Sequence, residues 1–282
     1  PKVLFLDSER LERFKHISDV DPEMKVVGVR LPEYDDGVIP WSDVAAHGGD
    51  LPEVDVDPDS DASIFYTSGT TGFPKGAQLT HRGCIANLMN MAYAAASSAL
   101  ATQMATGEAP PAEMPIPKTL LTTPLFHVTA NNCGAYNTTA AGGAMYLMYR
   151  WDAGEALKLV EAEKLTGISG VPVMSRELIN HPDFATTDTS SLLALSGGGA
   201  QVPPDLVQKI EDKVVTARPA TGYGMTETCG IITSIAGDFF VDKPDSAGPY
   251  MPSFEAKCVD DDGNTVPQGE LGELWVKGSP VI

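Results

Sequence analysis

Residues 66–76 combine the residue types that bind phosphate groups. The segment, YTSGTTGFPKG, holds three glycines, four Ser/Thr hydroxyls, one lysine and no acid. Glycine permits positive φ angles and a close approach of the backbone to a ligand, and successive N–H groups in such a loop bind anions. The hydroxyls and the Lys75 ammonium add hydrogen-bond donors. The composition therefore favours a site for phosphate oxygens, and a polar surface turn is the alternative.

The spacing of this segment differs from that of the common P-loop. A P-loop has Gly, four residues, Gly-Lys and then Ser or Thr at the start of a helix. Counting from Gly69, Lys75 falls on the lysine position, but Pro74 replaces the second glycine and Gly76 replaces the hydroxyl residue. The usual hydroxyl ligand of Mg²⁺ is therefore missing, and we expect no helix to begin at Lys75.

Two further glycine-rich segments, at 196–200 and 222–228, follow apolar stretches. Ligands bind at the carboxyl ends of the strands in open α/β sheets, so we expect all three glycine segments to lie together at that edge. Glu227 is the only acid of the third segment. A carboxylate beside phosphates needs a divalent cation between them, which makes Glu227 a candidate Mg²⁺ ligand; a solvated surface acid is the alternative. Thr226 can donate a hydrogen bond, and the Tyr223 ring can stack on a base.

The elements that must position these segments follow from the apolar pattern, which predicts an α/β fold with a parallel sheet. Predicted strands are 3–6, 26–29, 63–66, 119–123, 144–149, 167–170, 192–195 and 217–221, with an antiparallel pair at 256–259 and 271–276. Predicted helices are 8–14, 80–104 capped by Thr80, a small-residue helix ending at 141, 153–164 capped by Asp152, one opened by Pro172, and 205–212 opened by Pro203. The acidic stretch 51–61 is typical of a solvated linker.

The charge balance argues against two classes of partner. The chain has 19 Lys and Arg against 38 Asp and Glu, a formal net charge of −19. Binding to nucleic acid and electrostatic adhesion to anionic lipid both depend on basic residues. No stretch is long and apolar enough to span a bilayer, and peripheral membrane association stays open. The four cysteines are scattered without a C-x-x-C pair, which indicates reduced, largely packed thiols in a cytoplasmic protein.

Five motifs resemble those of the adenylate-forming enzymes, which include the acyl-CoA synthetases, the luciferases and the adenylation domains of peptide synthetases. They are YTSGTTGFPKG at 66–76, PLFH at 124–127, SGGGA at 196–200, GYGMTET at 222–228 and GELGELWVKGSPV at 269–281. They occur in the order of the family and span most of the chain. The resemblance implies the large N-terminal domain of such an enzyme: layered, parallel-rich sheets flanked by helices, with an antiparallel, barrel-like portion towards the C-terminus.

The same resemblance implies the site residues, position by position. The loop that grips the β- and γ-phosphates of ATP would comprise Thr67, Ser68, Gly69, Thr70, Thr71, Gly72 and Lys75. Residues at the adenine and acyl pockets would be Gly198, Gly199, Ala200, Thr221, Gly222, Tyr223 and Gly224, with Tyr223 on the adenine ring. The catalytic residues would be Lys75, His127, Thr226 and Glu227, of which Thr226 contacts the α-phosphate and Glu227 holds Mg²⁺.

Two of these positions, His127 and Thr221, need separate comment. His127 would lie where the acyl pocket meets the nucleotide, and the alternative is a core histidine bonded to a backbone carbonyl. The family often places an amide or an acid before Gly222 to bind the adenine amino group. Here that residue is Thr221, so the contact would pass to the backbone.

The implied reaction uses ATP, Mg²⁺ and coenzyme A, the last as a co-substrate. A carboxylate attacks the α-phosphorus of ATP, pyrophosphate leaves, and the thiol of coenzyme A then attacks the acyl-adenylate. Catalysis would rest on positioning and electrostatic stabilisation. No protein nucleophile is required, and the sequence shows neither a G-x-S-x-G motif nor a cysteine with an obvious base.

The segment PLFHVT at 124–129 looks most like that of the medium- and long-chain fatty acyl-CoA synthetases, so the resemblance implies that the activated acid is a medium- or long-chain fatty acid. Amino-acid-activating relatives place an Asp after the Phe of the aromatic segment, whereas residues 118–151 contain no acid. A buried ammonium without a counter-ion is expensive, which disfavours an amino acid. The small residues after His127 leave room for an acyl chain, although close helix packing explains them equally well. An aryl or other carboxylic acid, or a non-catalytic nucleotide-binding protein on the same fold, are the alternatives.

The resemblance also predicts the extent of the chain. We expect a truncated N-terminal domain with an incomplete leading subdomain and linker at 1–61, a nucleotide- and acyl-binding core at 62–250 and the start of a β-rich portion at 251–282. The family's ribose-binding Asp, its hinge and its catalytic lysine do not match any residue here. This piece is therefore expected to fold and to be nearly inactive by itself, and homodimer formation stays open.

Overall fold

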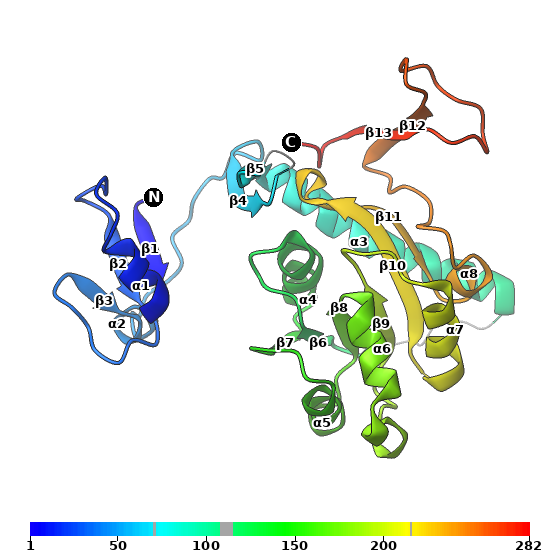
Figure 1. Ribbon diagram of the computed structural model, residues 1–282, viewed down its shortest axis with the longest axis horizontal. Helices are drawn as coiled ribbons and strands as arrows, with labels where there is room; N and C mark the ends of the chain where they lie inside the picture. Colours follow the sequence, from blue (N-terminus) through cyan, green and yellow to red (C-terminus); the bar gives the residue numbers. More distant parts are fainter. Residues whose placement is uncertain (70–71, 108–114, 215) are drawn as a thin grey trace. The chain divides into compact units, whose positions relative to one another are not determined.

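The computed structural model describes residues 1–69, 72–107, 115–214 and 216–282. Within these ranges the chain forms two compact units, Pro1–Asp55 and Val56–Ile282 (Figure 1). Thr70 and Thr71 of the predicted phosphate loop lie outside the described residues.

The first unit is a small parallel α/β layer. Its elements are β1 (Val3–Leu6), α1 (Ser8–Phe14), β2 (Lys25–Gly28), β3 (Val38–Pro40) and α2 (Trp41–Ala45), with the strands in the order β1-β2-β3. Both strand pairs are parallel. The Asp7 carboxylate accepts a hydrogen bond from the Arg10 N–H and caps α1. The β-α-β alternation that the sequence predicts here is confirmed, whereas β3 and α2 were not predicted.

A six-stranded sheet forms the centre of the second unit. The strands lie in the order β11-β10-β9-β8-β6-β7. Their bounds are β6 (Lys118–Leu121), β7 (Ala144–Leu147), β8 (Gly167–Gly170), β9 (Ala194–Gly197), β10 (Arg218–Met225) and β11 (Gly230–Ala236). Every neighbouring pair is parallel except β10 with β11, which is antiparallel. The prediction of a parallel-rich α/β sheet is confirmed.

One face of this sheet carries the hydrophobic core. Leu120, Ile168 and Leu195 lie side by side in register on β6, β8 and β9, and all three are buried. Against them pack the helices α5 (Ala153–Glu163), α6 (Pro172–Asn180), α7 (Pro204–Lys213) and α8 (Asp238–Asp242). Because consecutive strand residues point to opposite faces, the neighbours of this apolar row point to the other side of the sheet.

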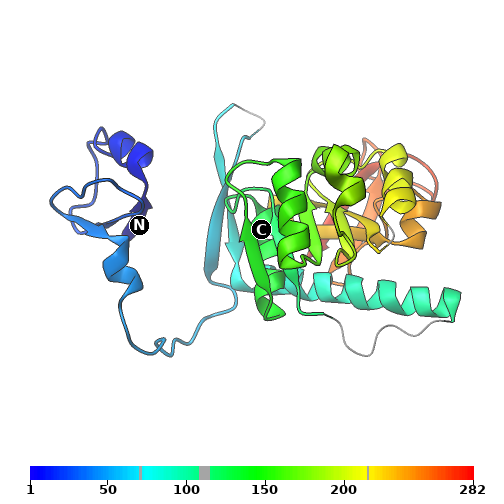
Figure 2. The same ribbon diagram turned by 90° about the horizontal axis from the view of Figure 1, so that it is seen from below.

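The other face is covered by elements built from small residues. They are α3 (His81–Thr106), the π-helix η1 (Thr129–Ala135) and α4 (Tyr136–Ala140). The Thr80 hydroxyl accepts a hydrogen bond from the Gly83 N–H and caps α3, as predicted. Figure 2 shows α3, in cyan, as one long rod along the second unit. Among the described helices, none has both the length and the apolar character needed to cross a membrane.

Two antiparallel hairpins complete the second unit. They pair β4 (Asp61–Thr67) with β5 (Lys75–Thr80) and β12 (Phe254–Val259) with β13 (Glu273–Gly278). The first glycine segment is thus the connection of a hairpin outside the central sheet. The expectation that it follows a strand of the parallel sheet is wrong, because β4 turns back onto β5. The absence of a helix at Lys75 is confirmed, since Lys75 begins a strand.

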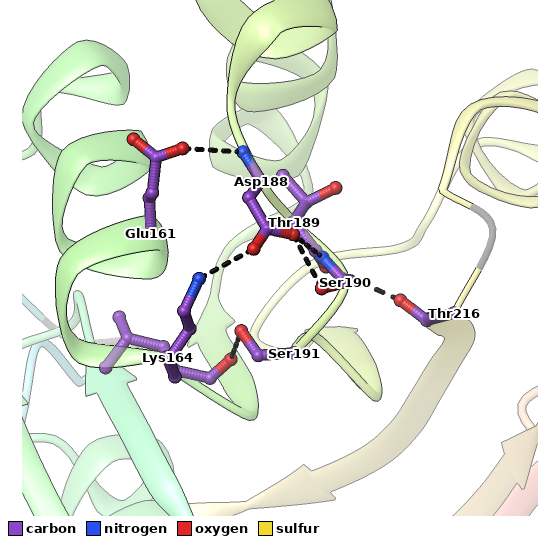
Figure 3. A network of polar contacts seen from close by, with 8 residues as sticks. Glu161, Lys164, Asp188, Thr189, Ser190, Ser191 and Thr216 are labelled. Carbon is purple, nitrogen blue, oxygen red and sulfur yellow. Dashed lines mark hydrogen bonds and ion pairs between the residues drawn. The ribbon is translucent and has the colours of Figure 1, made fainter.

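The end of α5 is tied to the loop that leads into β9 (Figure 3). The Lys164 ammonium lies 2.6 Å from an Asp188 carboxylate oxygen, and the Asp188 N–H donates to Glu161. Hydrogen bonds from Lys164 and Ser190 hold the pKa of Asp188 well below its ordinary value. The Ser191 hydroxyl donates to the Leu165 carbonyl.

These contacts explain why one predicted strand is out of place. The strand predicted at 192–195 begins two residues later, at Ala194, because the preceding residues belong to this polar loop. The helix predicted to open at Pro203 begins at Pro204, since Pro203 is extended with ψ of 138°. The polar loop with Asp188, Ser190 and Ser191 follows η2 (Pro182–Thr186) and leads directly into β9. Its contacts with α5 therefore fix where β9 begins.

Candidate active site

A cavity of about 650 Å³ lies in the second unit, over the face of the sheet opposite to the hydrophobic core. Its floor is formed by small residues of the strands, with Gly167 and Ala194 at one end and Gly222 at the other. Its other walls come from η1 and α4, and Met91 of α3 also lines it. A packed sheet face would need large side chains to fill this space; the small residues leave it open.

The cavity brings together most of the predicted site residues from distant parts of the sequence. Those that line it are Thr67, His127, Gly198, Gly199, Thr221, Gly222, Gly224, Thr226 and Glu227. Those that do not are Ser68, Gly69, Gly72, Lys75, Ala200 and Tyr223. Tyr223 lies between Gly222 and Gly224, which both line the cavity. Because consecutive side chains of a strand point to opposite faces, the Tyr223 ring is not among the groups that line it.

The third glycine segment is not the loop that we expected. Gly222 to Met225 are the end of β10 and pair with β11, and only the short 3-10 turn η3 (Thr226–Thr228) leaves the strand. A Cβ at Gly222 would lie 2.7 Å from the Thr233 carbonyl oxygen. The glycines therefore permit close pairing with a neighbouring strand, in addition to the close approach of a ligand.

Gly224 tolerates no side chain at all. A Cβ there would lie only 2.0 Å from the Gly230 carbonyl oxygen, and both partners are backbone. We expect Gly224→Ala to separate β10 from β11 and to lower the free energy of unfolding by about 2–3 kcal/mol, measured by chemical denaturation. Gly198→Ala is the matched control, because among the described residues its Cβ would meet a Thr129 methyl at 3.4 Å and no backbone atom. Equal stabilities of the two variants would contradict this account.

The turn that presents Thr226 and Glu227 is locked by its third residue. The buried Thr228 hydroxyl donates towards the Met225 and Gly230 carbonyls, each at 3.0 Å, and lies 3.1 Å from the Met225 nitrogen as an acceptor. Thr226 is half-buried and Glu227 is exposed. Neither hydrogen bonds nor ion pairs join the Glu227 carboxylate to other described residues. The geometry thus holds the backbone of the turn and leaves its carboxylate free.

Two buried asparagines support this turn from behind. The Asn87 side-chain oxygen accepts a hydrogen bond from the Ile231 N–H at 2.9 Å, and its nitrogen donates to the Asn132 carbonyl at 3.3 Å. The Asn132 amide donates to the Cys229 carbonyl at 2.9 Å. These contacts join α3, η1 and the start of β11 behind the Thr226–Glu227 turn.

His127 is exposed at the cavity, so the alternative of a buried core histidine is excluded. Its Nδ1 atom lies 3.2 Å from the Thr129 backbone nitrogen and accepts that N–H. A neutral imidazole that accepts at Nδ1 carries its proton at Nε2. His127 can therefore donate a hydrogen bond from Nε2.

Two described glycines of the first glycine segment have backbone angles in the left-handed region. Gly69 and Gly72 have φ angles of +64° and +86°, which favour glycine. A Cβ at Gly69 would also lie 2.4 Å from the Phe73 carbonyl oxygen. Thr67 lines the cavity, and Lys75 pairs with it across the hairpin. The Lys75 side chain is exposed and forms no ion pair with a described residue.

The site fits a magnesium ion that is held mainly by phosphate oxygens. Within the described ranges no three His, Cys, Asp or Glu side chains gather as a metal cluster. Mg²⁺ commonly binds one or two carboxylates together with substrate phosphates and water. The free Glu227 carboxylate, at a cavity that also contains Thr67 and Thr226, provides such a donor set.

Three cysteines lie at or behind the cavity, and all three are free thiols. Burial raises the pKa of the cavity-lining Cys133 to about 11, so it stays protonated. Behind the Thr226–Glu227 turn, a hydrogen bond from Cys229 lowers the pKa of Cys84, and both thiols are buried. All four cysteines are free, as predicted, although Cys258 is exposed rather than packed.

The sequence reasoning missed the residues that hold the site in place. Thr228 belongs to the motif GYGMTET at 222–228, and its hydroxyl could have indicated hydrogen bonds within the turn. Asn87 and Asn132 gave a weaker signal, as polar residues among small apolar ones on a predicted helix. Thr221 was among the predicted site residues, but its contact was not predicted: its hydroxyl donates to the Gly197 carbonyl at 3.2 Å and joins β10 to β9.

Comparisons with known proteins agree on one family. The family model described as AMP-binding enzyme matches residues 1–282. The feruloyl-CoA synthase of an Amycolatopsis species is 33% identical over 246 residues, which cover 86% of this chain and 46% of that protein. The chain therefore spans about half the length of the curated relatives it matches.

Solved structures show the same fold. A long-chain-fatty-acid-CoA ligase (FadD1) from Archaeoglobus fulgidus aligns with a TM-score of 0.77 and 26% identity, covering 99% of this chain and 54% of that one. The luciferase-like enzyme of the mealworm Zophobas morio aligns with a TM-score of 0.79 and 21% identity, covering 100% of this chain and 63% of that one.

Proposed function

Since this chain belongs to the AMP-binding enzyme family, we propose that the complete protein activates a carboxylic acid with ATP and transfers the acyl group to coenzyme A. The observation that carries the proposal is the Thr226–Glu227 turn. It presents a hydroxyl and an unpaired carboxylate at one cavity that also holds Thr67 and His127. These are the donors and the metal ligand that adenylation requires.

Each residue has one task in this scheme. The loop after Thr67, with Lys75, holds the departing pyrophosphate by backbone N–H groups and the ammonium. Thr226 donates to the α-phosphate oxygens, where charge builds as the carboxylate attacks. His127 donates from Nε2 at the junction of acid and nucleotide. Glu227 would hold Mg²⁺, which when bound would supply positive charge beside the phosphate oxygens.

The acid is proposed to be uncharged beyond its carboxylate and apolar in body, with a medium-chain fatty acid as the first candidate. Among the described residues that line the cavity, Glu227 is the only Asp, Glu, Lys or Arg, and His127 is the only histidine. This lining supports an apolar acid over an amino acid. The nucleotide must share the volume of about 650 Å³, which favours a medium chain over a long one. The name of the feruloyl-CoA synthase supports an aryl acid as the second candidate.

A panel of carboxylic acids tests this proposal in the complete protein. We expect pyrophosphate release that depends on the acid and on Mg²⁺, and formation of acyl-CoA when coenzyme A is added. Straight-chain acids of increasing length, hydroxycinnamic acids and amino acids form the three arms of the panel. Binding of ATP without pyrophosphate release from any acid would identify a non-catalytic nucleotide-binding protein instead.

A further inference from the structure

The end of the cavity floor that is farthest from Thr226 is a row of residues on the face of the sheet opposite to the hydrophobic core. Thr119, Gly167 and Ala194 are in register on β6, β8 and β9, and all three line the cavity. The next row, which includes Ile168, points into the hydrophobic core on the other face. Strand alternation therefore directs a side chain at position 167 into the cavity.

Gly167 has no structural reason to be glycine. Its backbone is an ordinary strand without a positive φ. Among the described residues, the only atom within 4 Å of a Cβ would be the Ala194 carbonyl oxygen at 3.7 Å. Other lining glycines are constrained: a Cβ at Gly134 would lie 2.6 Å from Leu121, and Gly199 has a φ of +74°. No contact with the described residues therefore requires a glycine at 167, and the absence of a side chain there leaves space in the cavity.

The position of Gly167 along its strand fixes what that space could hold. The chemistry lies beyond the carboxyl end of β8, where the Gly170 carbonyl accepts the Gly198 N–H at 3.0 Å. Gly167 is at the opposite end of the same strand, about 10 Å away at ~3.3 Å per residue. A ligand that begins at Thr226 and extends along the floor meets Gly167 with its far end.

The polar groups at that end already have partners. The Thr138 hydroxyl bonds the Thr119 hydroxyl at 3.2 Å, and the Thr166 hydroxyl accepts the Lys118 N–H at 2.9 Å. A ligand group at Gly167 thus meets hydroxyls that already form hydrogen bonds within the protein, which suits a methyl terminus or an unsubstituted ring edge.

We infer that Gly167 determines the length of the acid that the site accepts, and that the acid ends there in an apolar group. This inference rests on the proposed function. The acyl body lies along the floor from Thr226 to Gly167, between the strands and the residues of η1 and α4.

The test is the Gly167→Leu variant of the complete protein, assayed with straight-chain acids of increasing length and their ω-hydroxy analogues. We expect kcat/KM for the longest acids to fall roughly tenfold or more and that for the shortest acids to change less than about twofold. Gly167→Ala should shorten the profile by less. In the unaltered protein, each ω-hydroxy analogue of full length should be poorer than its parent acid.

Controls distinguish a misfolded variant, a wrong inference about Gly167 and a wrong proposed function. Ala162→Leu adds the same side chain on an exposed position of α5 and should leave the length profile unchanged. Circular dichroism identifies a misfolded Leu variant, in which case the Ala variant decides. A length profile that is the same in Gly167→Ala, Gly167→Leu and the unaltered protein would refute the inference. Absence of pyrophosphate release from every acid in the unaltered protein would refute the proposed function.

Discussion

Glu227→Gln is expected to lower kcat/KM for acyl-adenylate formation by about 10²–10³-fold, because a metal ion supplies several kcal/mol of stabilisation to the developing phosphate charge. Glutamine keeps the size of the side chain and removes its negative charge. The concentration of Mg²⁺ that gives half of the maximal rate should rise in the same variant. The measurement is pyrophosphate release by the complete protein as a function of Mg²⁺ concentration.

The control for this experiment is Glu255→Gln on β12. That carboxylate is also exposed and unpaired among the described residues, and it does not line the cavity. Its removal should leave both the rate and the Mg²⁺ dependence unchanged. If the Glu227 variant kept the Mg²⁺ dependence of the unaltered protein, the metal-binding role of Glu227 would be refuted and the alternative of a solvated surface acid would hold.

Asn87→Leu is expected to be the most destabilising polar-to-apolar change near the site. The variant would leave the Ile231 N–H without its Asn87 acceptor and would remove the Asn87 donor from the Asn132 carbonyl. An unsatisfied buried group costs about 1–3 kcal/mol, so we expect the free energy of unfolding to fall by about 1–3 kcal/mol. Chemical denaturation measures this loss.

The same change should also reduce catalysis through the Thr226–Glu227 turn. Asn87 contacts the start of β11 and no ligand atom in the proposed scheme, so its effect should appear in kcat more than in KM for ATP. Gln208→Leu on the exposed face of α7 is the matched control and should shift stability by less than about 0.5 kcal/mol. A stable Asn87→Leu variant with normal kcat would show that the buried amides do not hold the turn.

Local sequence determined much of the secondary structure. Thr80 and Asp152 cap their helices as predicted, and Asp7 caps α1 in the same way, because a side-chain oxygen needs only the N–H groups of the next turn. The strand at Gly167–Gly170 and the antiparallel pair β12–β13 were also predicted. Such features depend on neighbouring residues, which the sequence displays directly.

The motifs likewise pointed to the family and to residues that the fold then collected. Thr67, His127, Gly198 and the Thr226–Glu227 pair are far apart in the chain and line one cavity. Their types could be read from phosphate and metal chemistry without a structure. Their assigned roles remain predictions, which the variants above test.

Only the tertiary structure decided how the glycines are used. Gly224 has none of the freedom of a loop, because the backbone of Gly230 on β11 lies where its side chain would be. Gly167, which resembles any other strand glycine in the sequence, opens onto the cavity. In a sequence, a glycine shows only that a side chain is absent. Whether the space is filled by another strand or left open as a cavity depends on the residues that folding brings near it.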